Sequence, residues 1–333
     1  MREIKIKFLN ESKKKFIKYY LKDDVIFIES DTPDYVVFGP EQLAQGIKYQ
    51  CVRLWISGEN VRPDFNLVDY AIGFDDMMFG DRYLQFPYYM WPNRRETFEK
   101  AIRKHNNVDR DSAIHREFCG WIVSNGLWDN MYRDQIFDKL SQYKRIDSGG
   151  KYLNNQPDGE CIPMGESLEF YGRHKFTLAL ENSKMPGYTT EKIIEAWAGG
   201  NVPIYWGDPD IEKNFSSGAF INANKYNSLD DLLAEVIRID NDDDAYMRML
   251  GTPILFPGSR CYEYMREEYV RSFLENIFEK QTVEQARRRL NSGSYWGSYV
   301  ERDLSEFYQI REHQLIYRVV RKMSKLMKRK GNT

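Results

Sequence analysis

The stretch "KFTLALENSKMPGYTTEKIIEAWAGGNVPIYWGDPD" (Lys175–Asp210) decides the fold of this chain. The runs "KFTLALE" and "VPIYWG" near its two ends are typical of buried strands. Between them, "TTEKIIEAWAGG" has the pattern of a helix, with Thr189 as the expected N-cap and Gly199–Gly200 as the expected end. The stretch therefore predicts a strand–loop–helix–strand unit, which is the building block of a mostly parallel α/β sheet.

Lys192 lies in the first turn of that expected helix, where the partial positive charge of the helix N-terminus makes a lysine mildly unfavourable. The disadvantage disappears if an anion binds there, because backbone N–H groups converge at a helix N-terminus and suit a phosphate. A lysine that simply extends into solvent is equally consistent with the spacing. The glycine-rich loops GxxxxGK[ST] and GxGxxG are absent from the sequence, so a nucleotide here would be held without them.

The same alternation of strands and helices continues on both sides of this stretch. Further strand-like runs are "EIKIKFL", "VIFIE", "YVVFG", "CVRLWIS", "DYAIGF", "FCGWIVSN" and "KRIDSG". Helical patterns occupy residues 12–21 and 131–143. The chain is thus expected to be α/β along most of its length.

At 333 residues the chain is longer than the ~250–300 residues at which a single core stops growing, so two domains are expected. The strongly polar segment 93–113 marks the boundary between them. We predict an N-terminal α/β domain at 1–112, a second α/β domain at 113–295 and a C-terminal helical segment at 296–333. In such folds the ligand is expected in the cleft between the domains, at the carboxyl ends of the strands.

Composition narrows the class of protein. Hydrophobic residues make up 42% and charged residues 29% of the chain, as in a soluble globular protein. The four cysteines are far apart and form no CxxC pair, which argues against a disulfide framework or a zinc site and favours a reducing compartment. The sequence contains no apolar run of about 20 residues and no signal-peptide pattern, so we expect a cytoplasmic location.

Residues 311–330 carry eight Lys/Arg and one Glu, a local charge of +7 in a chain of net charge −2. Apolar residues recur there at three- and four-residue spacing, which predicts a basic amphipathic helix. Such a helix can lie on an anionic membrane surface, and we expect this use. A helix docked on the N-terminal domain and a nucleic-acid-binding arm are the alternatives; no nucleic acid is expected as a partner.

Several long blocks resemble one family, in the same order. They are "LENSKMPGYTTEKIIEAWAGGNVPIYWGDPD", "SGENVRPDFNLVDYAIGFDD", "DRYLQFPYY", "WIVSN" and "YKRIDSGG". These blocks lie within residues 50–260 and resemble the bacterial branch of the α-1,3/4-fucosyltransferases. The resemblance implies a GT-B fold, with two Rossmann-like domains facing a cleft, GDP-fucose as the donor and inversion at the anomeric carbon.

The resemblance also implies roles for particular residues. Inverting transfer needs a base for the acceptor hydroxyl and positive charge at the departing diphosphate. Glu59, after the run "CVRLWIS", matches the family's general base, whereas alone it reads as a solvent-exposed turn carboxylate. Lys192 matches the diphosphate contact. The other expected catalytic or donor-binding residues are Ser124, Asn125, Arg133, Asn182, Tyr188 and Glu191.

Arg133 is the expected second cation at the diphosphate, since the arginine fork suits phosphate oxygens. A surface arginine paired with Asp134 or Asp138 of the same helix is the alternative. Glu191 is expected to steady positive charge near the sugar in the transition state.

No metal site is expected. The "DPD" at Asp208–Asp210 imitates the DxD motif of metal-dependent glycosyltransferases, but two aspartates around a proline after a strand favour a turn. The four histidines show no HxH or HxxxH spacing. We therefore expect transfer without an essential cofactor or divalent metal.

The resemblance therefore implies an enzyme that moves L-fucose from GDP-fucose to the 3-hydroxyl of GlcNAc in N-acetyllactosamine-type acceptors, building Lewis-type surface glycans. Peripheral attachment to the inner face of the cytoplasmic membrane is expected. A GT-B transferase with another donor or acceptor, and a non-catalytic glycan- or membrane-binding protein, remain alternatives. Sequence spacing does not distinguish α-1,3 from α-1,4 regiochemistry.

Overall fold

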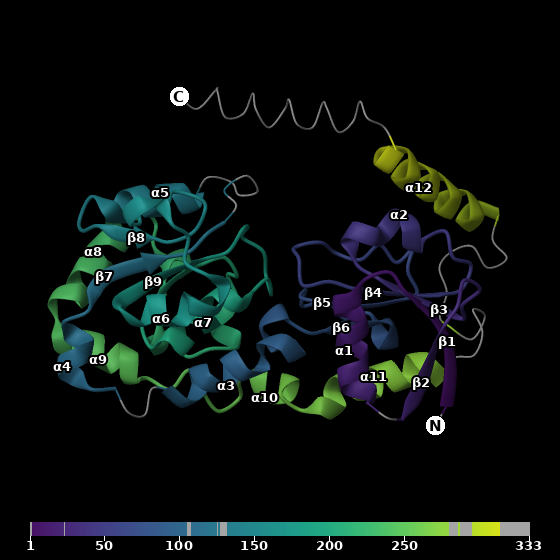
Figure 1. Cartoon of the computed structure of the whole chain (residues 1–333), viewed down its shortest axis with the longest axis horizontal. Coiled ribbons are helices and arrows are strands. Elements are labelled where there is room, and N and C mark those ends of the chain that lie inside the picture. The colour runs from purple at the N-terminus through teal and green to yellow at the C-terminus, as the bar shows by residue number, and fades with distance from the viewer. Residues whose placement is uncertain are drawn as a thin grey trace. The chain divides into compact units, whose positions relative to one another are not determined.

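The computed structural model describes residues 2–22, 24–104, 108–124, 126, 132–279, 286 and 295–313. By its internal packing the chain forms two units (Figure 1). Unit 1 comprises residues 1–73, 77–86 and 266–333, and unit 2 comprises residues 74–76 and 87–265. Each unit contains one sheet.

Unit 1 contains a six-stranded sheet in the order β2-β1-β3-β4-β5-β6, in which every neighbouring pair is parallel. The strands are β1 (Arg2–Phe8), β2 (Val25–Glu29), β3 (Tyr35–Phe38), β4 (Val52–Ile56), β5 (Tyr70–Gly73) and β6 (Tyr83–Gln85). The central strands β3 and β4 are buried along their whole length. This agrees with the apolar runs that predicted them, because parallel strands are covered on both faces.

Helices complete unit 1. They are α1 (Glu11–Leu21), α2 (Leu43–Gly46), α11 (Glu267–Glu279) and α12 (Tyr295–His313). Asn10 caps α1 by accepting the N–H groups of Ser12 and Lys13. α1 packs beside α11, so a segment from the far end of the sequence covers the N-terminal sheet (Figure 1).

Unit 2 contains a five-stranded parallel sheet in the order β11-β10-β9-β7-β8. The strands are β7 (Glu117–Trp121), β8 (Ile146–Ser148), β9 (His174–Leu180), β10 (Val202–Trp206) and β11 (Ile221–Asn222). The helices are α3 (Arg95–Lys104), α4 (Arg110–Ile114), α5 (Tyr132–Ser141), α6 (Ser167–Gly172), α7 (Glu191–Gly199), α8 (Leu229–Asn241), α9 (Asp243–Gly251) and α10 (Cys261–Tyr264). The predicted strand–helix–strand unit is thus confirmed as β9, α7 and β10.

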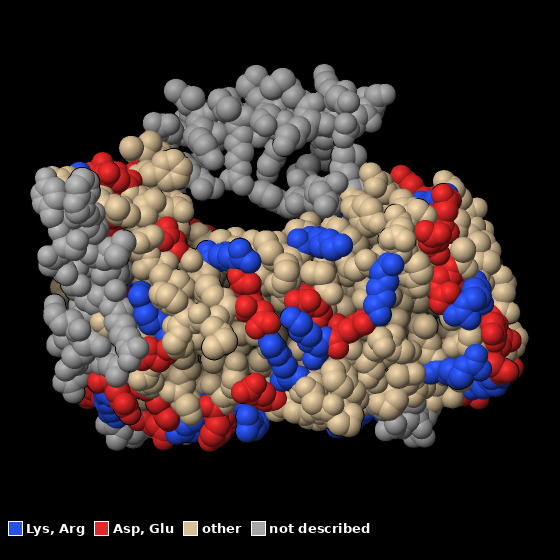
Figure 2. Space-filling view, turned by 180° about the vertical axis from the view of Figure 1, so that it is seen from behind, with Lys and Arg blue, Asp and Glu red and all other residues tan. Residues whose placement is uncertain are grey.

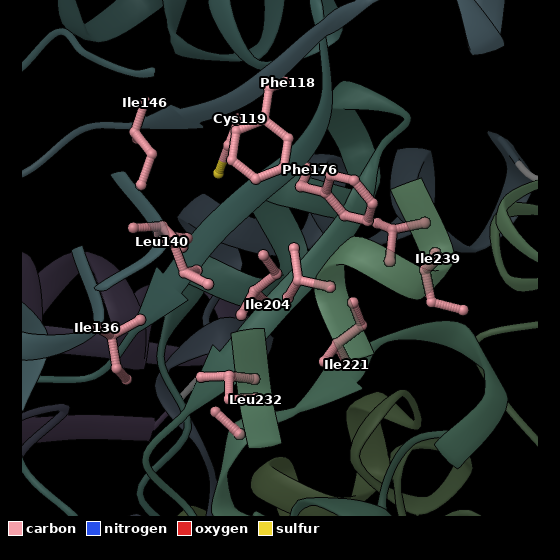
Figure 3. Close-up of a cluster of buried hydrophobic side chains, with 14 of the residues drawn as sticks. Phe118, Cys119, Ile136, Leu140, Ile146, Phe176, Ile204, Ile221, Leu232 and Ile239 are labelled. Atoms are coloured by element: carbon pink, nitrogen blue, oxygen red, sulfur yellow. The ribbon is translucent and has the colours of Figure 1, made fainter. Parts of the chain in front are cut away.

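The core of unit 2 is formed where strands meet helices α5 and α8. Figure 3 shows Phe118, Cys119, Phe176 and Ile204 from the sheet, with Leu232 and Ile239 from α8 among the side chains around them. All of these side chains are buried. This packing fixes the strands whose carboxyl ends carry the candidate site.

The division by packing differs from the predicted domain boundaries in three places, the smallest of which is segment 74–76, which belongs to unit 2. Segment 87–112 belongs to unit 2, because α3 packs against α7. Segment 266–295 belongs to unit 1, where α11 packs against α1. The polar composition of residues 93–113 therefore marks the exposed faces of α3 and α4, rather than a linker between domains.

The C-terminal helix α12 belongs to unit 1 and is anchored there by an ion pair. Glu301 of α12 lies 3.0 Å from the guanidinium of Arg53, which is fully buried in β4. The predicted basic tail at 311–330 lies outside the described residues from 314 onward. Within the described part of the chain, none of the helices combines the length and apolarity needed to span a bilayer.

Acidic and basic side chains are interspersed on the face drawn in Figure 2. Independently of that view, exposed ion pairs in the described structure include Lys7–Asp31 and Lys213–Asp210. Exposed pairs of this kind each contribute about 0–1 kcal/mol to the stability of the fold.

Candidate active site

The candidate site of unit 2 lies at the carboxyl ends of β9 and β10, next to the start of α7. Glu181 directly follows β9, and its backbone N–H donates to the carbonyl of Trp206 at the end of β10, 2.8 Å away. Gly207 follows β10, and a Cβ there would come within 2.4 Å of the Glu181 side chain. A glycine is therefore needed for β10 to pass this close to Glu181.

Glu181 is fully buried yet carries a network of hydrogen bonds. One carboxylate oxygen accepts the backbone N–H of Thr190 at 2.7 Å, and the other accepts the Thr190 hydroxyl at 2.7 Å. The second oxygen also accepts from the Lys192 ammonium at 3.0 Å. Burial raises the pKa of Glu181 above its ordinary value, although the charge of Lys192 and these hydrogen bonds oppose the shift.

Lys192 does not extend freely into solvent. Its ammonium donates to Glu181 and to the Thr190 hydroxyl, at 2.9 Å, and its side chain is only 23% exposed. Burial alone would lower the pKa of Lys192, but the carboxylates of Glu181 and Glu191 outweigh burial and raise it. The lysine is thus tolerated at the helix N-terminus because a buried carboxylate neutralises it. Among the residues that the structure describes, these contacts use two of its three N–H donors, which leaves one for an anion.

The N-cap of α7 differs from the prediction. The helix begins at Glu191 with Thr190 as its N-cap, and Thr190 makes no side-chain cap hydrogen bond because its hydroxyl is bonded to Glu181. Thr189, the predicted cap, donates its hydroxyl to Asp208 at 3.1 Å. The predicted helix end is confirmed, since Gly200 has φ +83° and closes the helix in the left-handed conformation.

Asp208 shapes the loop after β10, as predicted for the "DPD" segment. It is fully buried, and one of its carboxylate oxygens accepts the N–H of Asp210 at 2.8 Å, as in an Asx turn. The same oxygen accepts the N–H of Gly187 at 2.8 Å. The carboxylate therefore ties the loop before α7 to the loop after β10.

Two more carboxylates and an arginine surround the first turns of α7. Arg94, at the end of a single 3-10 turn (Pro92–Arg94), pairs with Glu195 at 3.0 Å. Burial and the neighbouring charge of Glu191 raise the pKa of Glu195 to about 7. Burial also acts to raise the pKa of Glu191, but the charges of Lys192 and Arg94 outweigh it, so this pKa is lowered. Glu191 is therefore an anion at neutral pH.

Arg133 and Asn182 are brought together from distant parts of the sequence. Arg133, in α5, is 1% exposed and donates to the side-chain carbonyl of Asn182 at 3.1 Å. Asn182 is the second residue after β9, beside Glu181. The alternative of a surface arginine is wrong because the side chain is buried. The structure thus places two predicted donor-binding residues in contact.

The other predicted donor-binding residues of unit 2 are Tyr188, Ser124 and Asn125, and they differ in how exposed they are. Tyr188 is 2% exposed and packs edge-on against Phe74, with ring centroids 5.2 Å apart. Ser124 is exposed in the segment after β7. Asn125 lies outside the described residues. In the parallel sheet, the ends of β7 and β9 share one edge, so Ser124 follows a strand on the same edge as the Glu181 network.

Glu59 belongs to unit 1, three residues after β4. Its side chain is exposed, and its backbone N–H donates to the hydroxyl of Ser57 at 3.0 Å. The ammonium of Lys13, in α1, interacts electrostatically with Glu41 and Glu59, while burial lowers the Lys13 pKa. The predicted base is thus an accessible carboxylate at the carboxyl edge of its own sheet.

Sequence reasoning missed four residues of the unit 2 network: Glu181, Thr190, Arg94 and Glu195. The predicted strand "KFTLALE" ends with Glu181, and a charged residue directly after a buried strand is a signal of a site at the strand's carboxyl end. Arg94 and Glu195 carry no such signal, because their pairing depends on the packing of α3 on α7.

Two family models match the chain. The alpha-(1,3)-fucosyltransferase FucT N-terminal domain matches residues 6–91, and the C-terminal model of glycosyltransferase family 10 (fucosyltransferase) matches residues 113–251. The chain belongs to glycosyltransferase family 10. In this family 10 chain, the Glu181–Lys192 network and Arg133 fall within the second match, and Glu59 falls within the first.

Known proteins resemble this family 10 chain over long stretches. The alpha-(1,3)-fucosyltransferase FucT of Helicobacter pylori is 29% identical over 262 residues, covering 69% of this chain and 54% of that protein. The human 4-galactosyl-N-acetylglucosaminide 3-alpha-L-fucosyltransferase FUT6 is 33% identical over 138 residues, covering 39% of this chain and 35% of that protein. The chain thus matches about half, or less, of the length of these relatives.

A solved structure shares the fold. A crystal structure of an alpha1,3-fucosyltransferase with GDP-fucose superposes with a TM-score of 0.70 at 24% identity, covering 85% of this chain and 93% of that chain. The two parallel sheets with their helices therefore form a GT-B-like α/β fold, as predicted.

Proposed function

We propose that this protein is an inverting fucosyltransferase, which moves L-fucose from GDP-fucose to the 3-hydroxyl of GlcNAc in N-acetyllactosamine-type acceptors. The observation that carries the proposal is the buried Glu181–Thr190–Lys192 network at the N-terminus of α7, in a chain of glycosyltransferase family 10. The names of the relatives support fucosyl transfer to N-acetylglucosaminides.

In this proposal, two cationic side chains bind the departing diphosphate and stabilise its negative charge. The Lys192 ammonium is held in place by Glu181 and Thr190 and keeps one N–H for a phosphate oxygen. Arg133, positioned by Asn182, supplies a second, planar donor group. Because both side chains are already oriented, little reorganisation is needed when negative charge develops on the leaving group.

Glu59 acts as the general base. As the oxygen of the acceptor hydroxyl forms its bond to C1 of fucose, its proton passes to the Glu59 carboxylate and the bond from C1 to the phosphate oxygen breaks, releasing GDP. The anionic Glu191 steadies the positive charge that develops on the sugar ring. Ser124, Asn125, Asn182 and Tyr188 contribute to the donor site.

No divalent metal is required in this mechanism, because Lys192 and Arg133 replace it at the diphosphate. Excess EDTA should therefore leave the initial rate of transfer unchanged at 25 °C. A rate that falls with EDTA and returns with added Mn²⁺ or Mg²⁺ would contradict this part of the proposal.

The decisive experiment measures fucosyl transfer from GDP-fucose to N-acetyllactosamine with the wild type and with Glu59→Gln. We expect Glu59→Gln to lower kcat about 10²–10⁴-fold, because a positioned general base contributes that much. Binding of GDP and thermal stability should be unchanged, since the Glu59 side chain is exposed. The exposed Glu41, which also faces Lys13, gives a matched control in Glu41→Gln.

Other outcomes distinguish the alternatives. One outcome is a wild type that binds GDP but transfers no fucose to N-acetyllactosamine-type acceptors with either linkage between galactose and GlcNAc (type 1 or type 2 chains). That result points to another acceptor or donor sugar. Wild type that binds neither GDP nor GDP-fucose overturns the donor assignment and favours a non-catalytic glycan- or membrane-binding protein.

We also propose that residues 311–330 attach the protein to anionic lipid on the inner face of the cytoplasmic membrane. The support is their charge of +7 and amphipathic spacing. Co-sedimentation of the full chain with vesicles of phosphatidylcholine containing 30% phosphatidylglycerol should exceed that with pure phosphatidylcholine. Replacing Lys322, Lys325, Lys328 and Arg329 with Gln should remove the difference.

A further inference from the structure

A second group of side chains of the types that bind metals lies near the amino ends of the unit 2 strands, opposite the ends that carry the Glu181–Lys192 network. Glu117 is the first residue of β7, His174 is the first residue of β9, and the two are paired in the sheet register. Asp147 lies in β8, on the other side of β7. One ligand atom from each of the three side chains lies within 4.8 Å of the others.

The hydrogen bonds of His174 fix which ring nitrogen faces the carboxylates. Its Nδ1 lies 2.8 Å from the backbone carbonyl of Phe170, which can only accept, so Nδ1 carries a proton. In the neutral ring Nε2 then presents a lone pair. Its neighbours are carboxylate oxygens of Asp147, at 3.2 Å, and Glu117, at 3.3 Å. With the ring neutral, three acceptor atoms converge in a place where His174 is only 1% exposed, an arrangement that a cation bound by all three would satisfy.

The separations suit a metal ion. A tetrahedral Zn²⁺ with bonds of about 2.0–2.1 Å needs neighbouring ligand atoms about 3.3 Å apart. The Nε2–Asp147 and Nε2–Glu117 separations match that edge length. The Glu117 side chain is 63% exposed, so water can occupy a fourth position.

Supporting contacts outside the group hold the ligands in the orientation that a metal needs. The Phe170 carbonyl orients the imidazole, and the Arg145 guanidinium donates to one oxygen of Asp147 at 2.9 Å, which leaves the other oxygen facing His174. Gly120 makes room for the ring, because a Cβ there would lie 2.9 Å from His174 Nδ1. These contacts are of the kind that orient ligands in metal sites.

We propose that Glu117, Asp147 and His174 bind one divalent transition-metal ion, of the class of Zn²⁺, at the amino ends of β7 and β9. The ends of β9 are six residue steps apart, about 20 Å, so the ion lies far from the Glu181–Lys192 network, which follows the other end of the strand. Its role is to join three strands of unit 2. It stabilises the fold and takes no part in sugar transfer.

Spacing along the sequence could not reveal this site. The three residues are 27 to 57 positions apart and come from three strands, so no short motif contains any two of them. Only the strand order β9-β7-β8 brings them together.

The test is titration of the EDTA-treated, dialysed full chain with ZnCl₂ by isothermal calorimetry at pH 7.5. We expect one ion per chain, and a loss of affinity of at least about tenfold in Glu117→Gln and in His174→Gln. Glu117→Gln is the safer variant because that side chain is exposed. A saturating amount of ZnCl₂ should raise the Tm of the wild type by about 5 °C but not that of Glu117→Gln.

Two matched controls exclude binding elsewhere. His115 and Asp111 form an exposed His–carboxylate pair in the same unit, 3.4 Å apart, and Cys161 is an exposed thiol. His115→Gln and Cys161→Ser should leave the affinity unchanged. The proposal is overturned if ZnCl₂ up to 100 µM gives no binding, or if Glu117→Gln and His174→Gln bind as the wild type does.

Discussion

Each unit holds a cation beside its parallel sheet, but the two cations are held mainly by different kinds of group. Arg53, in β4, is fully buried and donates to the backbone carbonyls of Tyr49, Leu67 and Ile47 and to Glu301. Lys192, at the first turn of α7, donates to the side chains of Glu181 and Thr190. Backbone carbonyls cannot change their charge, whereas carboxylates can.

The positions of the two cations explain the difference. Arg53 lies inside a central strand. Its guanidinium donates to backbone carbonyls outside that strand and pairs with Glu301 of α12. Lys192 lies at a helix N-terminus beyond the carboxyl ends of the strands, where a ligand can approach. These positions favour a structural role for Arg53, and for Lys192 the ligand-binding role that the proposed function gives it. Four variants test this comparison.

The largest effect is expected for Lys192→Ala. Loss of a preorganised donor at the diphosphate should lower kcat by roughly 10²–10³-fold and weaken GDP binding. Because buried Glu181 then lacks its cation, the free energy of unfolding should also fall, by about 3–5 kcal/mol. GDP calorimetry and denaturant unfolding measure the two effects. Lys213→Ala, which removes a surface lysine of the same unit, should change neither.

Arg53→Leu should separate stability from activity. It leaves Glu301 and three carbonyls without their guanidinium, so the free energy of unfolding should fall by about 3–5 kcal/mol. The fraction that is folded should bind GDP within about twofold of the wild type. Loss of GDP affinity in the folded Arg53 variant would contradict the structural role and break the comparison.

Glu181→Gln tests whether the partner of Lys192 positions it. A neutral amide offers one acceptor oxygen where the carboxylate offers two, so at least one of the three hydrogen bonds is lost, at a cost of about 1–3 kcal/mol. The negative charge that pairs with Lys192 is lost as well. GDP affinity should fall by about tenfold as Lys192 loses its fixed orientation. If Lys192→Ala and Glu181→Gln are combined, the loss of GDP affinity should equal that of Lys192→Ala alone. Additive losses would show that Glu181 acts independently of Lys192.

The remaining expected effect is a pH dependence of stability that comes from unit 2. The pKa of Glu195 is about 7 in the folded protein and about 4.5 ordinarily, so between these pH values the folded state keeps a proton that the unfolded state releases. The free energy of unfolding should therefore fall as pH rises from about 4.5 to 7, by at most about 3 kcal/mol, and then level off.

Glu195→Gln should flatten this part of the profile and stabilise the protein above pH 7. Urea unfolding at half-unit pH intervals measures it. An unchanged slope in Glu195→Gln would assign the titration to another group. Glu99→Gln, which alters a more exposed glutamate paired with arginines in the same unit, should leave the profile as in the wild type.

The spacing of apolar residues along the sequence predicted strands and helices well where that spacing was regular. The runs that became β3, β4, β9 and β10 are buried along their whole length because parallel strands are covered on both faces, whereas β1 alternates exposed charged residues with the buried Ile4 and Ile6. The boundary at 112 differed from the packing because α3 has a polar exposed face while its other face packs on α7. Polarity records exposure, not the unit to which a helix belongs.

The sequence by itself determined the parallel α/β class, the β9–α7–β10 unit and the presence of Lys192 at a helix N-terminus, because periodicity and capping act over a few residues. Only the tertiary structure decided that Glu181 neutralises Lys192, that Arg133 contacts Asn182 and that His174 faces two carboxylates. These contacts join residues 11 to 57 positions apart. They depend on the order in which strands assemble into the sheet, which the burial of the whole core selects and which no local pattern encodes.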